Sequence, residues 1–336
     1  MTIISGQRNL ITDVAGLRVG HAQDDHIKTG VTAILCDRET TAAVQVLGGA
    51  PGTRETDLLE PHNTVQHVNA IVLAGGSAFG LDAASGVQAY LRANKIGFEA
   101  AGHHIPIVPA AILFDMHNGG NKEWQRYPPY RELGYLAAEN AAQDFTLGSA
   151  GAGAGALVAG IKGGLGSASH VLNTGITLGA LVAVNAVGSV TIGQSRHFWA
   201  APFEQNAEFG GLGYPHPLPV NATEVRIKFR DASPQTNTTI GAIATDAVLT
   251  KAQAKRLAIA AHDGYARAIW PAHTPFDGDL IFALATGASG IEPSVHDFID
   301  LCAAAASTMA RAVARGVYLA TPQDNDLFPC WQQLKD

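Results

Sequence analysis

The feature that most restricts the fold of this chain is a long stretch without acidic residues. Neither Asp nor Glu occurs between positions 145 and 203, and within this stretch residues 171–195 carry no charge at all. That segment is long enough to span a bilayer, but its Asn, Ser, Thr and Gly residues would make a poor lipid-facing helix. Its β-branched residues, placed between glycines, suit two buried strands joined by a turn. We therefore expect interior sheet here and no membrane span.

Strand-like and helix-like blocks alternate in the rest of the 336 residues. A buried-strand pattern is followed by a helical one near the N-terminus, and Ala and Leu recur at helical spacing near the C-terminus. The predicted strand covers residues 70–73, and the predicted helices cover 78–91, 133–143, 251–270 and 293–314. Residues 194–219 mix aromatics, Gly and Pro without a period, which is typical of an exposed loop. This alternation predicts an α/β fold, and 47% hydrophobic residues suffice for a substantial core.

Composition excludes several classes of function. A net charge of −7 argues against nucleic acid as a partner, because a phosphate-binding surface needs a basic stripe. Three widely separated cysteines, Cys36, Cys302 and Cys330, form neither a disulfide framework nor a zinc motif. The N-terminus lacks the basic-then-apolar pattern of a secretory signal. We expect a cytoplasmic protein without a metal or cofactor.

A candidate nucleophile lies in the segment TNTTIGAIAT, residues 236–245, where a hydroxyl-rich turn opens an apolar strand. If the bond between Asn237 and Thr238 were cut, Thr238 would gain a free α-amine beside its own hydroxyl. The ordinary pKa of such an amine, about 7.7 to 8.0, suits a general base near neutral pH. The hydroxyl of Thr238 could make the cut itself by attacking the carbonyl of Asn237. On the local sequence alone, a plain turn that leads into a β-branched strand is the favoured interpretation.

Two carboxylates, Asp277 and Asp279, stand two residues apart in the segment TPFDGD, residues 274–279. In an extended backbone they point to one face, so both could approach one hydroxyl and one amine. Paired acids can orient such groups or share a proton when the site is partly dry. A calcium loop of the EF type is excluded, because the position that should carry its closing Glu is Ala288.

Two polar residues in the acid-free stretch, Lys162 and Asn185, are flanked by apolar and glycine residues. Lys162 follows a Gly- and Ala-rich run and has no local acidic partner, so it must find a distant carboxylate, lose its proton or reach solvent. Asn185 lies in an apolar run and needs hydrogen-bond partners if it is buried. Its amide could donate to a developing oxyanion, a contribution worth roughly 3 kcal/mol. The alternatives are a surface lysine and a strand-end residue bonded to backbone.

Several motifs together resemble one known family. They are GLRVGH (16–21), GGAPGTRETD (48–57), IVLAGGSAFGLD (71–82), IPIVPA (105–110), GAGAGA (151–156), KGGLG (162–166), NTTI (237–240) and FDGD (276–279). In this order they resemble the DmpA-type aminopeptidases, which are self-processing hydrolases of the N-terminal-nucleophile kind. The family includes β-aminopeptidases and endo-type nylon-oligomer hydrolases.

The resemblance implies a single four-layer αββα sandwich over residues 1–336, similar to DmpA and ornithine acetyltransferase, with the nucleophile at the end of a central strand. It implies a cut before Thr238 that gives an α chain of residues 1–237 and a β chain of residues 238–336. Thr238, Lys162, Asn185, Asp277 and Asp279 match the family's site positions. The Thr, Lys and paired Asp are similar to the nylon-hydrolase branch, whereas aminopeptidase members carry Ser with a Tyr, Ser and Glu set. Relatives assemble as tetramers of αβ pairs.

We therefore expect a self-processing amidohydrolase or aminopeptidase. It would cleave short peptide-like amides, such as β-peptides, amino-acid amides or ω-amino-acid oligomers, through an acyl-enzyme. Two alternatives stay open. One is an acyl transferase like ornithine acetyltransferase, although its Ala-Thr-Met type of junction is absent. The other is a binding or assembly protein that keeps the sandwich and never cuts itself.

Overall fold

One long strand organises the sheet. In this computed structural model, which describes residues 4–230 and 237–335, β2 (Thr29–Val46) pairs antiparallel with β1 (Leu17–Asp24) and β4 (His67–Ala74), mainly through its first half. Its second half pairs with β13 (Leu280–Ala285). A register shift separates the two halves. The strand therefore belongs to two sheet regions at once.

Among the described residues, the strands form one nine-stranded sheet in the order β10-β11-β12-β13-β2-β4-β7-β3, with β1 on the side of β2, and two small two-stranded sheets, β5-β6 and β8-β9. The other strands are β3 (Thr53–Arg54), β5 (Phe98–Ala100), β6 (His103–Ile105), β7 (Ala110–Ile112), β8 (Leu157–Val158), β9 (Ile161–Lys162), β10 (Gly164–Val171), β11 (Thr177–Asn185) and β12 (Thr238–Thr245). The α-helices are α1 (Ala83–Ala93), α2 (Tyr130–Glu139), α3 (Lys251–Ala268) and α4 (Val295–Tyr318). Short 3-10 helices are η1 (Ile11–Asp13), η2 (Asp57–Leu59), η3 (Ser77–Asp82), η4 (Gly151–Gly153), η5 (Ala201–Phe203) and η6 (Trp331–Gln333).

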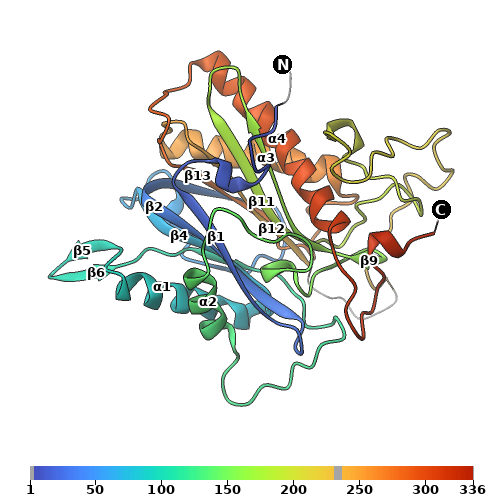
Figure 1. Cartoon of the computed structure of the whole chain (residues 1–336), viewed down its shortest axis with the longest axis horizontal. Helices are drawn as coiled ribbons and strands as arrows, with labels where there is room; N and C mark the ends of the chain where they lie inside the picture. Colours follow the sequence, from blue (N-terminus) through green and yellow to red (C-terminus); the bar gives the residue numbers. More distant parts are fainter. Residues whose placement is uncertain (1–3, 231–236, 336) are drawn as a thin grey trace.

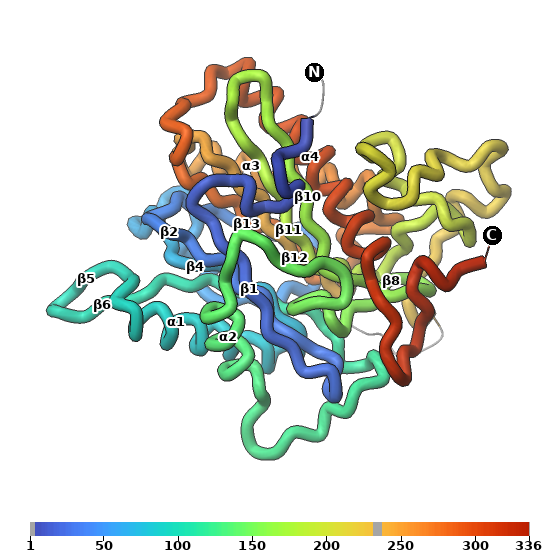
Figure 2. The backbone as a smooth tube through the Cα atoms, viewed as in Figure 1, coloured from blue at the N-terminus to red at the C-terminus, as the bar shows by residue number. Residues whose placement is uncertain are grey.

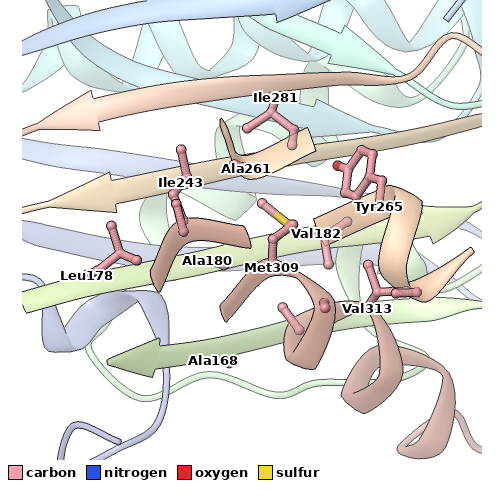
Figure 3. Close-up of a cluster of buried hydrophobic side chains, with 14 of the residues drawn as sticks. Ala168, Leu178, Ala180, Val182, Ile243, Ala261, Tyr265, Ile281, Met309 and Val313 are labelled. Atoms are coloured by element: carbon pink, nitrogen blue, oxygen red, sulfur yellow. The ribbon is translucent and has the colours of Figure 1, made fainter. Parts of the chain in front are cut away.

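Three buried clusters show that the elements form four layers. The middle cluster joins side chains of β1, β2 and β4 to side chains of β10–β13, so the two sheet regions face each other. One outer cluster packs α1 and α2 on the β1, β2 and β4 side. The other packs α3 and α4 against β10–β13, where Tyr265 and Met309 meet strand residues such as Ile243 (Figure 3). The two helix pairs lie on opposite sides of the strands (Figure 1). The expected αββα sandwich is confirmed.

Most of the predicted elements form. The strand at 70–73 is part of β4, and the four helical patterns correspond to α1, α2, α3 and α4. The first helix begins later than predicted, because residues 77–82 form the 3-10 helix η3. α3 and α4 pack closely: a Cβ on Gly264 would lie 2.5 Å from the carbonyl oxygen of Ala306. Small residues on these helices therefore permit the close approach.

One prediction is wrong in part. Residues 171–195 contain one strand, β11, and not two. The turn precedes β11 and connects it to β10, which lies almost entirely upstream of the segment. After Asn185 the backbone leaves the ladder, and Ser189 instead pairs with Trp270. Among the described residues, none of the helices combines the length and apolarity needed to cross a membrane.

After β11, residues 186–230 run as loops, with η5 as the one regular element there. In Figure 2 the yellow part of this segment lies beside the C-terminal end of the chain. Contacts hold the two together: Phe198 stacks on Trp331, and the Trp331 indole donates to the carbonyl of Arg196 at 2.9 Å. The predicted loop at 194–219 therefore exists and packs on the C-terminal segment.

Candidate active site

Topology brings the predicted nucleophile and the acidic pair to one edge of the sheet. β12 begins at Thr238, and β13 begins at Leu280, directly after Asp279. The two strands are parallel, because α3 crosses over between them, so their first residues meet at the same edge. On its other side β12 pairs antiparallel with β11, whose last residue, Asn185, lies opposite Thr238. Three of the predicted site segments therefore converge.

The peptide bond before Thr238 is held on both sides. The N–H of Asn237 donates to the carbonyl of Phe276 at 2.8 Å, and the N–H of Gly278 donates to the carbonyl of Asn237 at 2.8 Å. The hydroxyl of Thr238 donates to the same carbonyl at 2.5 Å. A candidate nucleophile thus lies beside the carbonyl that it would attack, and a backbone N–H already points at the oxygen that would become negative.

Gly278 is required for this arrangement by its lack of a side chain. A Cβ there would lie 2.7 Å from the Thr238 hydroxyl oxygen and 2.7 Å from the carbonyl oxygen of Ala50. Any other residue would push against the hydroxyl. The glycine between the two aspartates therefore permits the close approach of the acidic loop to β12.

Asp279 fixes the start of β12 next to Thr238. It is 1% exposed, and its Oδ1 accepts from the Thr239 N–H at 2.8 Å. Its Oδ2 accepts from the backbone N–H of His273 at 3.0 Å and lies 2.9 Å from the Nδ1 of that residue. This carboxylate therefore holds the residue after Thr238, whereas the Thr238 hydroxyl itself bonds to the carbonyl of Asn237.

Asp277 is equally buried and joins two loops. Its Oδ1 accepts from the Val187 N–H at 3.1 Å, and its Oδ2 accepts from the N–H and the hydroxyl of Thr274 at 2.9 and 2.7 Å. Burial and then the negative charge of Asp279 raise the pKa of Asp277 to about 6. The donated hydrogen bonds oppose this rise. Asp277 is therefore poised to change charge close to neutral pH.

Asn185 is buried, and both its side-chain oxygen and its side-chain nitrogen bond to neighbouring groups. Its Oδ1 accepts from the Leu157 N–H at 3.0 Å, and its Nδ2 donates to the carbonyl of Phe114 at 2.9 Å. One of its two amide N–H groups is therefore committed to backbone. The structure therefore matches the alternative of a strand-end residue bonded to backbone. A contact with an oxyanion would have to use the second N–H of the Asn185 amide.

Lys162 finds the distant carboxylate that its surroundings require. It is 2% exposed, and its Nζ bonds to Asp326 at 2.8 Å and to Gln323 at 3.3 Å. Asp326 also binds the buried Lys28, at 2.7 Å. The structure thus places the Lys162 ammonium in a charged cluster with the C-terminal segment, while the other four predicted residues meet at the β12 edge.

Sequence reasoning missed a buried lysine that bonds to Asn185. Lys228 is 6% exposed, and its Nζ bonds to the carbonyl of Leu157 at 2.7 Å and to the Oδ1 and carbonyl of Asn185 at 3.0 and 3.3 Å. Burial lowers its pKa to about 7, which the nearby charges of Asp277 and Asp115 partly oppose. Lys228 sits in VRIKFR, residues 225–230, where charged residues alternate as on a surface strand. That pattern gave no signal of burial.

His273 and Thr274 were missed as well. Both lie in the loop before the acidic pair, and they donate to Asp279 and Asp277 respectively. Their spacing of six and three residues from these partners carries no recognisable motif. A search for hydroxyl or imidazole residues close in sequence to a candidate carboxylate would have found them.

Comparison with known proteins gives matches along most of the chain. A model of peptidase family S58 matches residues 9–326. An uncharacterized aminopeptidase of Mycobacterium bovis is 42% identical, over 96% of this chain and 98% of that protein. A 6-aminohexanoate-oligomer endohydrolase of Kocuria sp. is 28% identical, over 84% of this chain and 76% of that protein.

A solved structure has the same fold. The L-aminopeptidase D-Ala-esterase/amidase of Ochrobactrum anthropi, whose structure is described as a variant of the Ntn hydrolase fold, superposes with a TM-score of 0.70. The match covers 98% of this chain and 93% of that one at 23% identity. This likeness concerns the arrangement of the elements.

Proposed function

Because the chain belongs to peptidase family S58 and is a peptidase or amidohydrolase, we propose that it cuts its own bond between Asn237 and Thr238. The new N-terminal Thr238 would then hydrolyse short peptide-like amides. The observation that carries this proposal is the hydroxyl of Thr238, 2.5 Å from the carbonyl oxygen of Asn237, with the Gly278 N–H on the same oxygen.

Self-cleavage begins when the Thr238 hydroxyl oxygen bonds to the carbonyl carbon of Asn237. Negative charge then develops on the carbonyl oxygen, where the Gly278 N–H stabilises it. The carbon–nitrogen bond breaks, and the Thr238 nitrogen takes up the hydroxyl proton and becomes an amine. Water next hydrolyses the ester and leaves a carboxylate on Asn237.

Turnover uses the same hydroxyl with a new base. The freed α-amine, whose pKa is normally about 7.7 to 8.0, accepts the hydroxyl proton while the oxygen attacks a substrate carbonyl. The resulting acyl-enzyme is hydrolysed by water. Asn185, opposite Thr238, would donate its second N–H to the oxyanion, Asp279 would hold the backbone at Thr239, and Asp277 would set the local charge. Lys162 would act on the site through its charge.

The substrate class rests on the relatives. Some relatives are named as aminopeptidases, and others are named as hydrolases of 6-aminohexanoate oligomers. We propose a substrate with a free amine and a nearby amide, which includes β-peptides, α-amino amides and ω-amino-acid oligomers. A panel of these three amide types, assayed with the processed protein, ranks them.

Intact mass spectrometry of three proteins tests the nucleophile. The wild-type chain should give two masses that correspond to residues 1–237 and 238–336, whereas Thr238→Ala should stay as one inactive chain. Thr239→Val is the matched control, because the Thr239 hydroxyl is buried and has no partner among the described residues; this variant should be cut and active. A Thr238→Ala protein that is cut at this bond, or that hydrolyses amides at the wild-type rate, contradicts the proposal.

The oligomeric state is proposed from the family resemblance, and the cellular location is a proposal as well. We propose a cytoplasmic tetramer of αβ pairs, as in the relatives that the motifs resemble. Light scattering of the processed protein measures the mass of the assembly directly, and a monomeric αβ pair would contradict it.

A further inference from the structure

The ammonium group of Lys228 is held by three oxygen atoms and by no directly bonded carboxylate among the described residues. These acceptors are the carbonyl of Leu157, the carbonyl of Asn185 and the side-chain oxygen of Asn185, at 2.7, 3.3 and 3.0 Å. An ammonium has three N–H donors, so this set satisfies it completely. The oxygens thus form a site that recognises a primary ammonium.

This ammonium site lies beside the scissile bond. Asn237 lines the same pocket as Lys228 and Asn185, and Asp115 adds a carboxylate to its wall. Within the described part of the chain, no water-sized space remains in this pocket. Thr238 is itself 2% exposed. A substrate cannot reach the nucleophile in this state, so some part of the wall has to move.

The wall that can move is the segment of residues 224–230. Its backbone is fixed to the body through the Lys228 N–H, which donates to the carbonyl of Val187 at 2.8 Å. Its Phe229 ring lies between His117, edge-on at 5.0 Å, and Phe328, stacked at 5.2 Å. Lys228 precedes Asn237 by nine residues, so a cut after Asn237 leaves this segment near a free chain end. Chain ends are tied down less firmly than internal segments.

We propose that the pocket beside Asn237 is a primary-ammonium site, which Lys228 fills in the uncut chain and which the free amine of a substrate takes over after the cut. The inference rests on the proposed function and adds a subsite to it. We call segment 224–230 the plug, because it covers Thr238 in the uncut chain. Self-cleavage then creates a free chain end near the plug, and the plug moves away together with Lys228.

The charges around the pocket favour this exchange. The carboxylates of Asp277 and Asp115 attract the Lys228 ammonium, and both stay in place when the lysine departs. A neutral occupant would not be attracted by these carboxylates, and it would leave the Asn185 and Leu157 oxygens with fewer donors. The vacated site therefore offers three acceptor oxygens and nearby negative charge to a primary ammonium.

Chemical rescue tests the ammonium site without any need for activity. In the uncut Thr238→Ala background, Lys228→Ala removes a side chain whose missing part corresponds to n-propylammonium. Millimolar n-propylammonium should raise the Tm of the double variant by several degrees with a saturable dose dependence, and n-propanol should not. The Thr238→Ala protein, whose site is already filled, should not respond. An equal response to n-propanol, an equal response of Thr238→Ala, or no response would overturn the ammonium site.

Limited trypsin digestion tests the release and needs no change at Lys228. After intact mass has established the extent of self-cleavage, the processed wild type should be cut after Lys228 at least tenfold faster than uncut Thr238→Ala. The bond after Lys251, a buried lysine in α3, should resist trypsin equally in both proteins. Equal resistance after Lys228 in both would overturn the plug. A wild type that never cuts itself would instead overturn the proposed function and the release step, while chemical rescue would still decide the ammonium site.

Discussion

Replacement of Lys228 by Met should flatten the pH dependence of stability of the uncut chain. The folded pKa of Lys228, about 7, lies below its ordinary value of 10.5 because burial disfavours the charged form. Between these values the unfolded chain binds more protons than the folded chain, so rising pH stabilises the fold. The cost of charging Lys228 is fully present below pH 7 and disappears toward pH 10.5. From pH 7 to pH 9 this single group should add about 2 kcal/mol to the free energy of unfolding.

Urea unfolding of Thr238→Ala and of Thr238→Ala with Lys228→Met, each followed by tryptophan fluorescence at pH 7 and pH 9, measures the effect. The parent should gain about 2 kcal/mol more than the Met variant over this interval. Lys255→Met is the matched control, because the side chain of Lys255 is 22% exposed and pairs with Glu60; its gain should equal that of the parent. If parent and Lys228→Met gain equally, Lys228 is not a buried lysine with a lowered pKa.

Three further predictions concern the site. Gly278→Ala should slow self-cleavage at least tenfold and cost about 1–3 kcal/mol of stability, because its Cβ meets the Thr238 hydroxyl; two masses at the wild-type rate would contradict the packing. Thr274→Val removes a donor to Asp277, so the acid limb of the self-cleavage rate, expected near pH 6, should move to higher pH, and an unmoved limb would separate Asp277 from the reaction. Asp326→Asn leaves two buried lysines without their carboxylate and should cost about 3–5 kcal/mol in urea unfolding, whereas the exposed Asp324→Asn should cost almost nothing.

The local sequence located the candidate site residues better than it located their hydrogen-bond partners. Thr238, Asp277 and Asp279 were recognisable because the strand and the acidic pair lie in short, characteristic motifs, and a helix between two strands implies a parallel pair. The partner of Lys162 could not be predicted from local sequence, because Asp326 lies 164 residues further along the chain. Lys228 was missed because its acceptors are mostly backbone carbonyls, which every residue has.

The error over residues 171–195 has a similar origin. Apolar, β-branched residues on both sides of Gly188 look alike in sequence, yet only β11 has neighbours on both edges. Beyond Asn185 the chain meets the loop around Trp270 instead of another ladder. Periodicity records which residues are buried, and it does not record whether a partner strand is present.

The place of β12 and β13 within the sheet has a consequence for a severed molecule. These two strands are neighbours of each other, and both belong to residues 238–336, while β11 on one side and β2 on the other belong to residues 1–237. A break after Asn237 would therefore produce two polypeptides that share one sheet, with the two strands of the shorter chain hydrogen-bonded between strands of the longer one. Denaturant should be needed to part them, so a native preparation would travel as one particle and a denaturing gel would reveal two bands.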